Sequence, residues 1–170
     1  MLIKRILFVV MLALLAACQT NPEKPSTTDG VSSDLSVRIA SSDPQPGHFA
    51  VVDANGRALY VTPEPVMNSK DFKRVDAAVD QLGEPVVILE LSEAAVDRLA
   101  EVSEHYKGKK LAIMLGNKVL TAPVLKSRMS VSRLMISGLG SAQEVDALVQ
   151  KMRGRSENDS EQDAEPAVAE

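Results

Sequence analysis

Apolar and polar side chains alternate in short runs through the first third of the chain. Such alternation is typical of strands with one buried face, and it predicts strands over residues 35–39, 48–52 and 58–61. The dipeptide Asn55-Gly56 lies between the last two runs. Because both residues tolerate positive φ, this dipeptide predicts a tight hairpin that connects the two strands.

A different spacing follows, in which apolar residues recur every three or four positions. It predicts a helix that begins at Asn68 or Ser69 and ends at Gly83. The apolar face of this helix would hold Phe72, Val75, Val79 and Leu82. Its solvated face would hold Asp71, Asp76 and Asp80.

Two more helices are predicted from their capping residues. Ser92 precedes an apolar stripe at helical spacing, and Gly108 follows that stripe. Ser141 and Glu144 have the spacing of a capping box, in which the hydroxyl accepts the Glu144 N–H and the carboxylate reaches back.

Four short apolar runs, some of them rich in β-branched residues, complete the pattern. They predict strands over residues 85–91, 111–115, 119–121 and 134–137. Helices that interleave with strands in this order indicate an α+β fold. We expect a mixed β-sheet with about three helices packed on one face.

The chain begins with a basic segment and an apolar run that ends in Leu15-Ala16-Ala17-Cys18. This arrangement is typical of a secretory signal peptide. It also resembles a bacterial lipobox, which implies cleavage between Ala17 and Cys18 and lipidation of Cys18. A transmembrane anchor is the alternative, but the run is shorter than the roughly 20 apolar residues that a spanning helix needs.

Lipidation of Cys18 would anchor the protein in a membrane. Stable attachment needs more than one acyl chain, and a lipobox cysteine typically carries several. Gln19 follows the cysteine, and by resemblance to enterobacterial sorting it implies transfer to the outer membrane. We therefore expect a cell-envelope protein that is lipid-anchored, faces the periplasm and lies in the outer membrane.

Composition divides the chain into five parts. We expect a signal peptide at 1–17, a flexible polar tether at 18–34, N-terminal strands at 35–57, the main domain at 58–153 and a disordered acidic tail at 154–170. The tail carries Glu157, Asp159, Glu161, Asp163, Glu165 and Glu170 against Arg155 alone. It is interpreted as a solubilising end.

Charge and residue types narrow the classes of function. The net charge of −4, the absence of Trp and an aromatic content of 3% argue against nucleic-acid binding. Cys18 is the single cysteine and His48 and His105 are the only histidines, so we expect neither a disulfide nor a metal site. The glycine-rich segment 137–141 precedes a helix, where anions can bind, but the capping box already satisfies those donors.

One segment resembles a known family. Residues 108–124 read GKKLAIMLGNKVLTAPV, and this stretch resembles the head part of the first periplasmic domain of the protein translocase subunit SecD. Ile136-Ser137-Gly138 and the capping box that follows are similar to the same family. The resemblance extends over residues 58–152.

The resemblance implies a binding module without a cofactor rather than an enzyme. SecD, together with SecF, assists the export of unfolded polypeptides, and its head is thought to contact the emerging chain. We therefore expect an envelope lipoprotein that binds exported polypeptides or helps to assemble an envelope complex. A structural accessory subunit, docked on a single envelope complex without binding clients, is the alternative; an enzyme is a third reading, for which no serine lies in a Gly-x-Ser-x-Gly elbow.

The candidate binding surface lies directly after the strand at 119–121. It consists of Pro123, Leu125, Lys126, Arg128 and Met129. The proline interrupts the strand, which indicates a sheet edge or a bulge. An edge with apolar and basic neighbours is suited to an extended peptide that binds by strand addition. The same pattern also allows the alternative that Leu125 and Met129 belong to the hydrophobic core.

Overall fold

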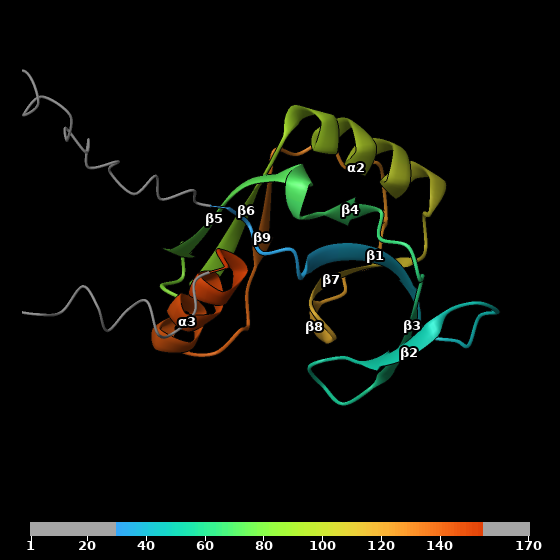
Figure 1. Cartoon of the computed structure of the whole chain (residues 1–170), viewed down its shortest axis with the longest axis horizontal. Helices are drawn as coiled ribbons and strands as arrows, with labels where there is room; N and C mark the ends of the chain where they lie inside the picture. The colour runs from blue at the N-terminus through green and yellow to red at the C-terminus, as the bar shows by residue number, and fades with distance from the viewer. Residues whose placement is uncertain (1–29, 155–170) are drawn as a thin grey trace, which may run out of the picture.

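Two antiparallel β-sheets and two α-helices make up residues 30–154, the part of the chain that the computed structural model describes (Figure 1). Sheet A consists of β1 (Leu35–Ser41), β2 (Phe49–Val52), β3 (Ala58–Val61), β4 (Met67–Asn68), β7 (Lys110–Leu115) and β8 (Lys118–Thr121). Sheet B consists of β5 (Phe72–Val79), β6 (Pro85–Leu91) and β9 (Arg133–Ile136). The other elements are the 3-10 turn η1 (Ser69–Asp71) and the helices α2 (Glu93–His105) and α3 (Ala142–Met152).

Strand order places β1 in the middle of sheet A. The order is β2-β3-β1-β7-β8. Strand β4 pairs with the same edge of β1 as β3 does, but β4 lies at the beginning of β1 and β3 at its end. In sheet B the order is β5-β6-β9. Every strand pairing within residues 30–154 is antiparallel, whereas the sequence predicted one mixed sheet.

A single large hydrophobic cluster, here called the main core, joins both sheets and both helices. Sheet A contributes alternate residues such as Val37 and Ile113, sheet B contributes Leu89 and Ile136, and α2 contributes Leu99. Helix α3 packs against β5 and β6, and α2 lies near β4, at a different part of the molecule (Figure 1). Each helix therefore covers a different part of the main core.

A second, smaller cluster lies on the opposite face of sheet A and is formed by strands alone. This hairpin cluster consists of Ala40, Val51, Leu59, Val61, Ala112, Met114 and Val119. It is enclosed because sheet A curls until β2 lies against β8, although these strands are the two ends of the strand order. At its rim the Arg38 guanidinium lies 5.5 Å from the centre of the Phe49 ring and donates a hydrogen bond to the Thr62 carbonyl at 2.9 Å.

The helix predicted between Asn68 and Gly83 is wrong. Asn68 does cap a turn, but only the 3-10 turn η1, and β5 follows immediately. A bulge between Phe72 and Arg74 shifts the register against β6, so that Phe72 and Val75 both reach the main core. Two buried residues three positions apart resemble a helical spacing, and the bulge thereby hid the strand.

The other predicted elements lie close to their observed bounds. Ser92 and Ser141 are the N-caps of α2 and α3, and the capping box between Ser141 and Glu144 is present. The hairpin at Asn55-Gly56 is also present, with Gly56 at φ +75°. The α+β class is confirmed, and the described part of the chain forms two α-helices and the short turn η1 instead of about three helices on one face.

The first and last described residues meet at one corner of the molecule. The Ser32 N–H donates to the Met152 carbonyl at 2.6 Å, and Gly154 lies beside Ser32. Next to Gly154, Arg153 donates to the Val75 carbonyl and to Asp76, both at 2.8 Å. The end of α3 is thus fixed to β5 and to the segment that leads into β1.

Candidate functional site

The segment after β8 continues the sheet beyond the end of that strand. The Leu111 N–H donates to the Pro123 carbonyl at 2.9 Å, and the Leu125 N–H donates to the Lys109 carbonyl at 2.8 Å. Val124 lies between these two bonds, in an antiparallel bridge with Lys110. Residues 123–125 therefore form a short extension of the sheet A edge.

The backbone of Val124 faces away from β7. Along an extended strand, successive residues direct their N–H and C=O groups to alternate sides. Since Pro123 and Leu125 bond to β7, the polar groups of Val124 are directed outward, and they have no hydrogen-bond partner within residues 30–154. The Val124 side chain is 46% exposed. We call this position the Val124 edge.

The predicted surface is divided between solvent and core. Pro123, Lys126 and Arg128 are exposed. Leu125 is only 1% exposed and belongs to the main core, whereas Met129 is half-buried against it. For Leu125 the core interpretation is thus correct, and an exposed Leu125 is excluded.

A buried serine fixes the path of the chain after Leu125. The Ser103 hydroxyl, on α2, donates to the Ala100 carbonyl and accepts the Met129 N–H at 2.7 Å. This bond holds the segment 126–129 alongside the C-terminal half of α2. No local sequence pattern indicated this bond, because it joins residues that are 26 positions apart.

Four exposed cations lie in the two segments that meet at the Val124 edge, the one before β7 and the one after Leu125. This basic patch consists of Lys107, Lys109, Lys126 and Arg128. The Gly108 N–H donates to the Leu125 carbonyl at 2.8 Å, which brings the lysines before β7 next to Lys126. On the α2 side, a shallow hollow of about 540 Å³ is lined by Arg128 together with Glu101, Val102, Glu104, His105 and Tyr106.

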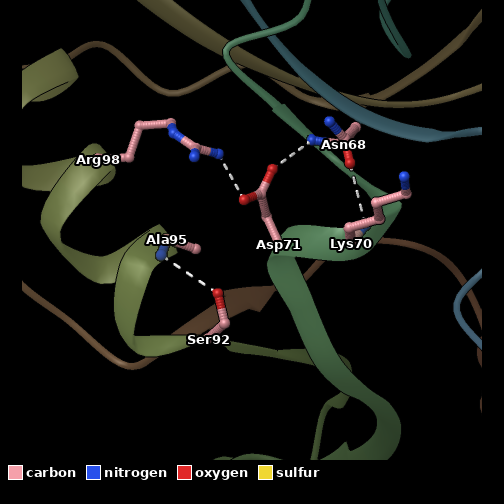
Figure 2. A network of polar contacts seen from close by, with 6 residues as sticks. All are labelled: Asn68, Lys70, Asp71, Ser92, Ala95 and Arg98. Carbon is pink, nitrogen blue, oxygen red and sulfur yellow. Dashed lines mark hydrogen bonds and ion pairs between the residues drawn. The ribbon is translucent and has the colours of Figure 1, made fainter.

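A polar network holds α2 against the connection between the two sheets. Figure 2 shows the buried Asp71 carboxylate between the Asn68 N–H, at 2.8 Å from one oxygen, and the Arg98 guanidinium at the other. The Ser92 N–H, at the start of α2, donates to the Asp71 carbonyl at 2.8 Å. The buried side-chain polar atoms of this network all have hydrogen-bond partners within the protein. We therefore assign the network the structural role of holding the start of α2 in place.

The aspartates expected on a solvated helix face have structural partners instead. Asp71 is 6% exposed, and Asp76 pairs with Arg74 and Arg153 at 2.6 and 2.8 Å. Asp80 accepts the N–H groups of Leu82 and Glu84 in the turn between β5 and β6. Their expected placement on a solvated helix face is therefore wrong.

Two carboxylates have lowered pKa values because they cap backbone turns. The Arg57 N–H lowers the pKa of Asp53 in the β2–β3 turn, with help from the Arg57 side chain and the Asn55 N–H. The Ser141 N–H and hydroxyl lower the pKa of Glu144 at the start of α3. The segment 137–141 therefore acts as a helix cap in this structure.

Each of the two histidines takes part in local contacts. His48 Nδ1 is 3.2 Å from the Pro46 carbonyl oxygen, and the His105 ring packs edge-on against Tyr106 with 4.7 Å between ring centres. Within residues 30–154, no group of three or more His, Cys, Asp or Glu side chains is arranged to hold a metal ion. In the same residues, neither helix is long and apolar enough to cross a membrane.

Sequence comparisons relate the chain to translocase subunits. It is 37% identical to SecD of Aquifex aeolicus over 100 residues, which are 58% of this chain and 20% of that protein. It is 34% identical to SecD of Acidaminococcus fermentans over 91 residues, or 54% of this chain and 22% of that protein. The chain thus corresponds to about a fifth of the length of these relatives.

Solved structures show the same fold. A chain described as "a membrane component SecDF that enhances protein export" superposes with a TM-score of 0.58 and 23% identity, over 75% of this chain and 64% of that one. SecDF in the "Super-membrane-facing form" gives a TM-score of 0.57 at 23% identity, over 75% of this chain and 19% of that one. The family model for the SecDF P1 head subdomain matches residues 45–156. The resemblance to the SecD periplasmic head is thereby confirmed, and the chain belongs to the SecDF P1 head subdomain family.

Proposed function

We propose that this protein is a lipid-anchored envelope module of the protein-export system that binds extended segments of exported polypeptides at the Val124 edge. Its role is binding and not catalysis. The observation that carries the proposal is the outward-facing N–H and C=O of Val124, which have no partner within residues 30–154. Membership of a family of export components supports the class of ligand.

The chemistry of the Val124 edge suits an unfolded chain. A strand added to a sheet edge is held by main-chain hydrogen bonds, which every polypeptide can form regardless of sequence. The exposed Val124 side chain offers an apolar contact, and Lys126 and Arg128 offer charge beside it. Binding of this kind is weak and tolerant of sequence, as a module that handles many different chains requires.

Photo-crosslinking in cells tests the site. A photoreactive residue is placed singly at Val124, Lys126, Arg128 or Met129, and at Leu82, which is 86% exposed in the β5–β6 turn, as the control. Leu125 is unsuitable because its side chain is buried. Adducts with many secreted proteins at the four positions, and few at Leu82, support the proposal.

The other outcomes separate the alternatives. One discrete adduct would indicate a structural accessory subunit on a single envelope complex. The absence of adducts at all four positions would overturn the proposed site.

Two substitutions of Val124 test the mode of binding. Val124→Pro removes the outward N–H, while the bonds that Pro123 and Leu125 make to β7 remain available. Val124→Ile retains the N–H and is the matched control. If strand addition is the mode of binding, the proline variant loses its adducts to secreted proteins and the isoleucine variant keeps them. Equal adduct yields in both variants would contradict strand addition.

The proposed anchor lies outside the described residues. It is supported by the sequence around Ala17 and Cys18 and by Gln19 at the following position. Mass spectrometry of the purified protein should detect a diacylglyceryl-modified Cys18 as the first residue, and Cys18→Ser should abolish the modification. Sucrose-gradient fractionation then assigns the membrane, and recovery with the inner membrane would refute outer-membrane sorting.

A further inference from the structure

The acidic end of the chain and the basic patch have complementary charges, and we propose that residues 155–170 bind the basic patch within the same molecule and cover the Val124 edge. The inference rests on the proposed function, since it concerns what occupies that edge when no polypeptide is bound. Its occupant is a segment of this chain that lies outside the described residues.

Among the described residues, the basic patch finds no ion-pair partner. Lys107, Lys109, Lys126 and Arg128 are all exposed, and none of them pairs with a carboxylate within residues 30–154. Glu101 and Glu104 line the same hollow as Arg128, and none of the three lysines lines that hollow. Three lysines therefore remain available to an acidic ligand at the Val124 edge.

The segment 155–170 supplies the opposite charge. It contains six carboxylates and a single cation, Arg155, which gives a formal charge of −5. It also ends in the small apolar run Ala167-Val168-Ala169 before Glu170. Such a segment can place carboxylates next to lysines and a short apolar stretch next to the exposed Val124 side chain.

The distance to be covered matches the length of the segment. The chain leaves the structure at Gly154, beside Ser32, and the nearby Asp34 carbonyl accepts the Gly116 N–H at the end of β7. The lysines of the basic patch lie beyond the other end of β7, and Lys109 is seven residues from Gly116, or about 24 Å at 3.4 Å per residue. A flexible chain of the same length as residues 155–170 has a root-mean-square span of about 20–24 Å.

A segment whose span matches the separation binds at a high effective concentration. For short flexible linkers this concentration is of the order of millimolar, so individually weak ion pairs are sufficient for occupancy. Exported polypeptides must then compete with the segment 155–170 for the Val124 edge. Competition of this kind selects for clients that offer a better strand or more negative charge, and it weakens as salt screens the ion pairs.

Paramagnetic relaxation measured on methionine methyl groups tests the contact. The full chain in detergent micelles carries a spin label on Ser160→Cys, with Cys18→Ser so that the label is unique. Met129 reports on the patch, the 62% exposed Met135 reports on sheet B, and Met114 is a buried control. We expect selective broadening of Met129 at low salt and its loss at 1 M salt, where the screening length is about 3 Å. Broadening of Met135 instead, or of neither methyl, would overturn the proposal.

Charge substitutions test whether the lysines of the basic patch form the contact. Lys109→Gln combined with Lys126→Gln should abolish the broadening of Met129. Lys73→Gln on β5, also exposed and outside the patch, is the matched control and should leave it unchanged. If the patch variant broadens as strongly as the wild type, the lysines are not the binding site.

A second measurement separates this proposal from the proposed function. Neutralising the six carboxylates to Gln or Asn should raise the crosslinking yield at Val124 severalfold, because the competitor is removed. If Met129 is broadened but no variant gives client adducts, the intramolecular contact stands and the polypeptide-binding function fails. If adducts form and the neutral variant yields no more than the wild type, the Val124 edge binds clients and the intramolecular competition fails.

Discussion

The main core and the hairpin cluster use the same kinds of side chain but are closed differently. The main core is covered by α2 and α3 and contains residues from both sheets. The hairpin cluster is enclosed only by the curl of sheet A, and the 39% exposed Phe49 ring lies at its rim under Arg38. Regions with fewer buried contacts open at lower free energy, so we expect the β2–β3 hairpin to open while the main core stays folded.

The largest effect is expected in the main core. Leu99 is fully buried on α2, and Leu99→Ala removes apolar contacts and leaves a cavity, which should lower the free energy of unfolding by about 3–5 kcal/mol. Urea denaturation followed by circular dichroism measures the loss. A loss below about 1 kcal/mol would mean that the site collapses readily and would remove the contrast between the two regions.

The same substitution in the hairpin cluster should cost less and act locally. Leu59 is 1% exposed on β3, and Leu59→Ala is expected to cost about 2–3 kcal/mol, since a region at the rim can relax into the cavity. Hydrogen exchange should lose protection in β2 and β3 before it changes in sheet B. Uniform loss of protection would show that the two regions open as one unit.

The ion pair between Asp71 and Arg98 in the polar network also stabilises the packing of α2, and it can be removed without changing the main core. Asp71→Asn loses the ion pair to Arg98, and we expect a loss of about 1–2 kcal/mol, limited because the Arg98 side chain is 45% exposed and partly screened by solvent. Asp97→Asn, exposed on the same helix, is the control. Combining Asp71→Asn with Arg98→Gln completes a double-mutant cycle, and additive losses would mean that the two groups do not interact.

Acid pH should weaken each region through one carboxylate. The pKa of Asp53 lies below its ordinary value of 3.8, and the pKa of Glu144 lies below 4.5. Because the folded-state pKa is the lower one, each group stabilises the fold above its ordinary pKa, and this stability is lost as pH falls through the lowered value. As the pH falls from 5 to 3, hydrogen exchange should show a loss of protection in the β2–β3 turn, and Asp53→Asn should remove this pH dependence. Protection of α3 should fall over the same range, and Glu144→Gln should remove that pH dependence. Unchanged pH profiles in both variants would contradict this assignment.

Local sequence patterns predicted the elements whose signals are themselves local. The caps Ser92 and Ser141 and the Asn55-Gly56 turn depend on a few neighbouring residues, and all three are present. The strand β5 was missed because its bulge depends on the register with β6, which is distant information. A period of three or four residues over one short window does not separate a helix from a bulged strand.

The candidate surface shows the same limit. The sequence located the interruption at Pro123, but it left open whether Leu125 faces solvent or the main core. That choice depends on the hydrogen bonds of residues 123–125 to the start of β7 and on the bond from Met129 to Ser103. The ion pair between Asp71 and Arg98, 27 residues apart, gave no local signal either.

The first and last described residues lie side by side at the Ser32–Met152 hydrogen bond, and this determines the point about which an attached domain rotates. A domain attached through residue 30 has its pivot at this corner, and whatever is joined after Gly154 shares that pivot. The Val124 edge lies at the far end of β7, on a lever arm of about 17 Å. Rotation about the corner therefore displaces this edge farther than it displaces the described residues next to Ser32 and Met152.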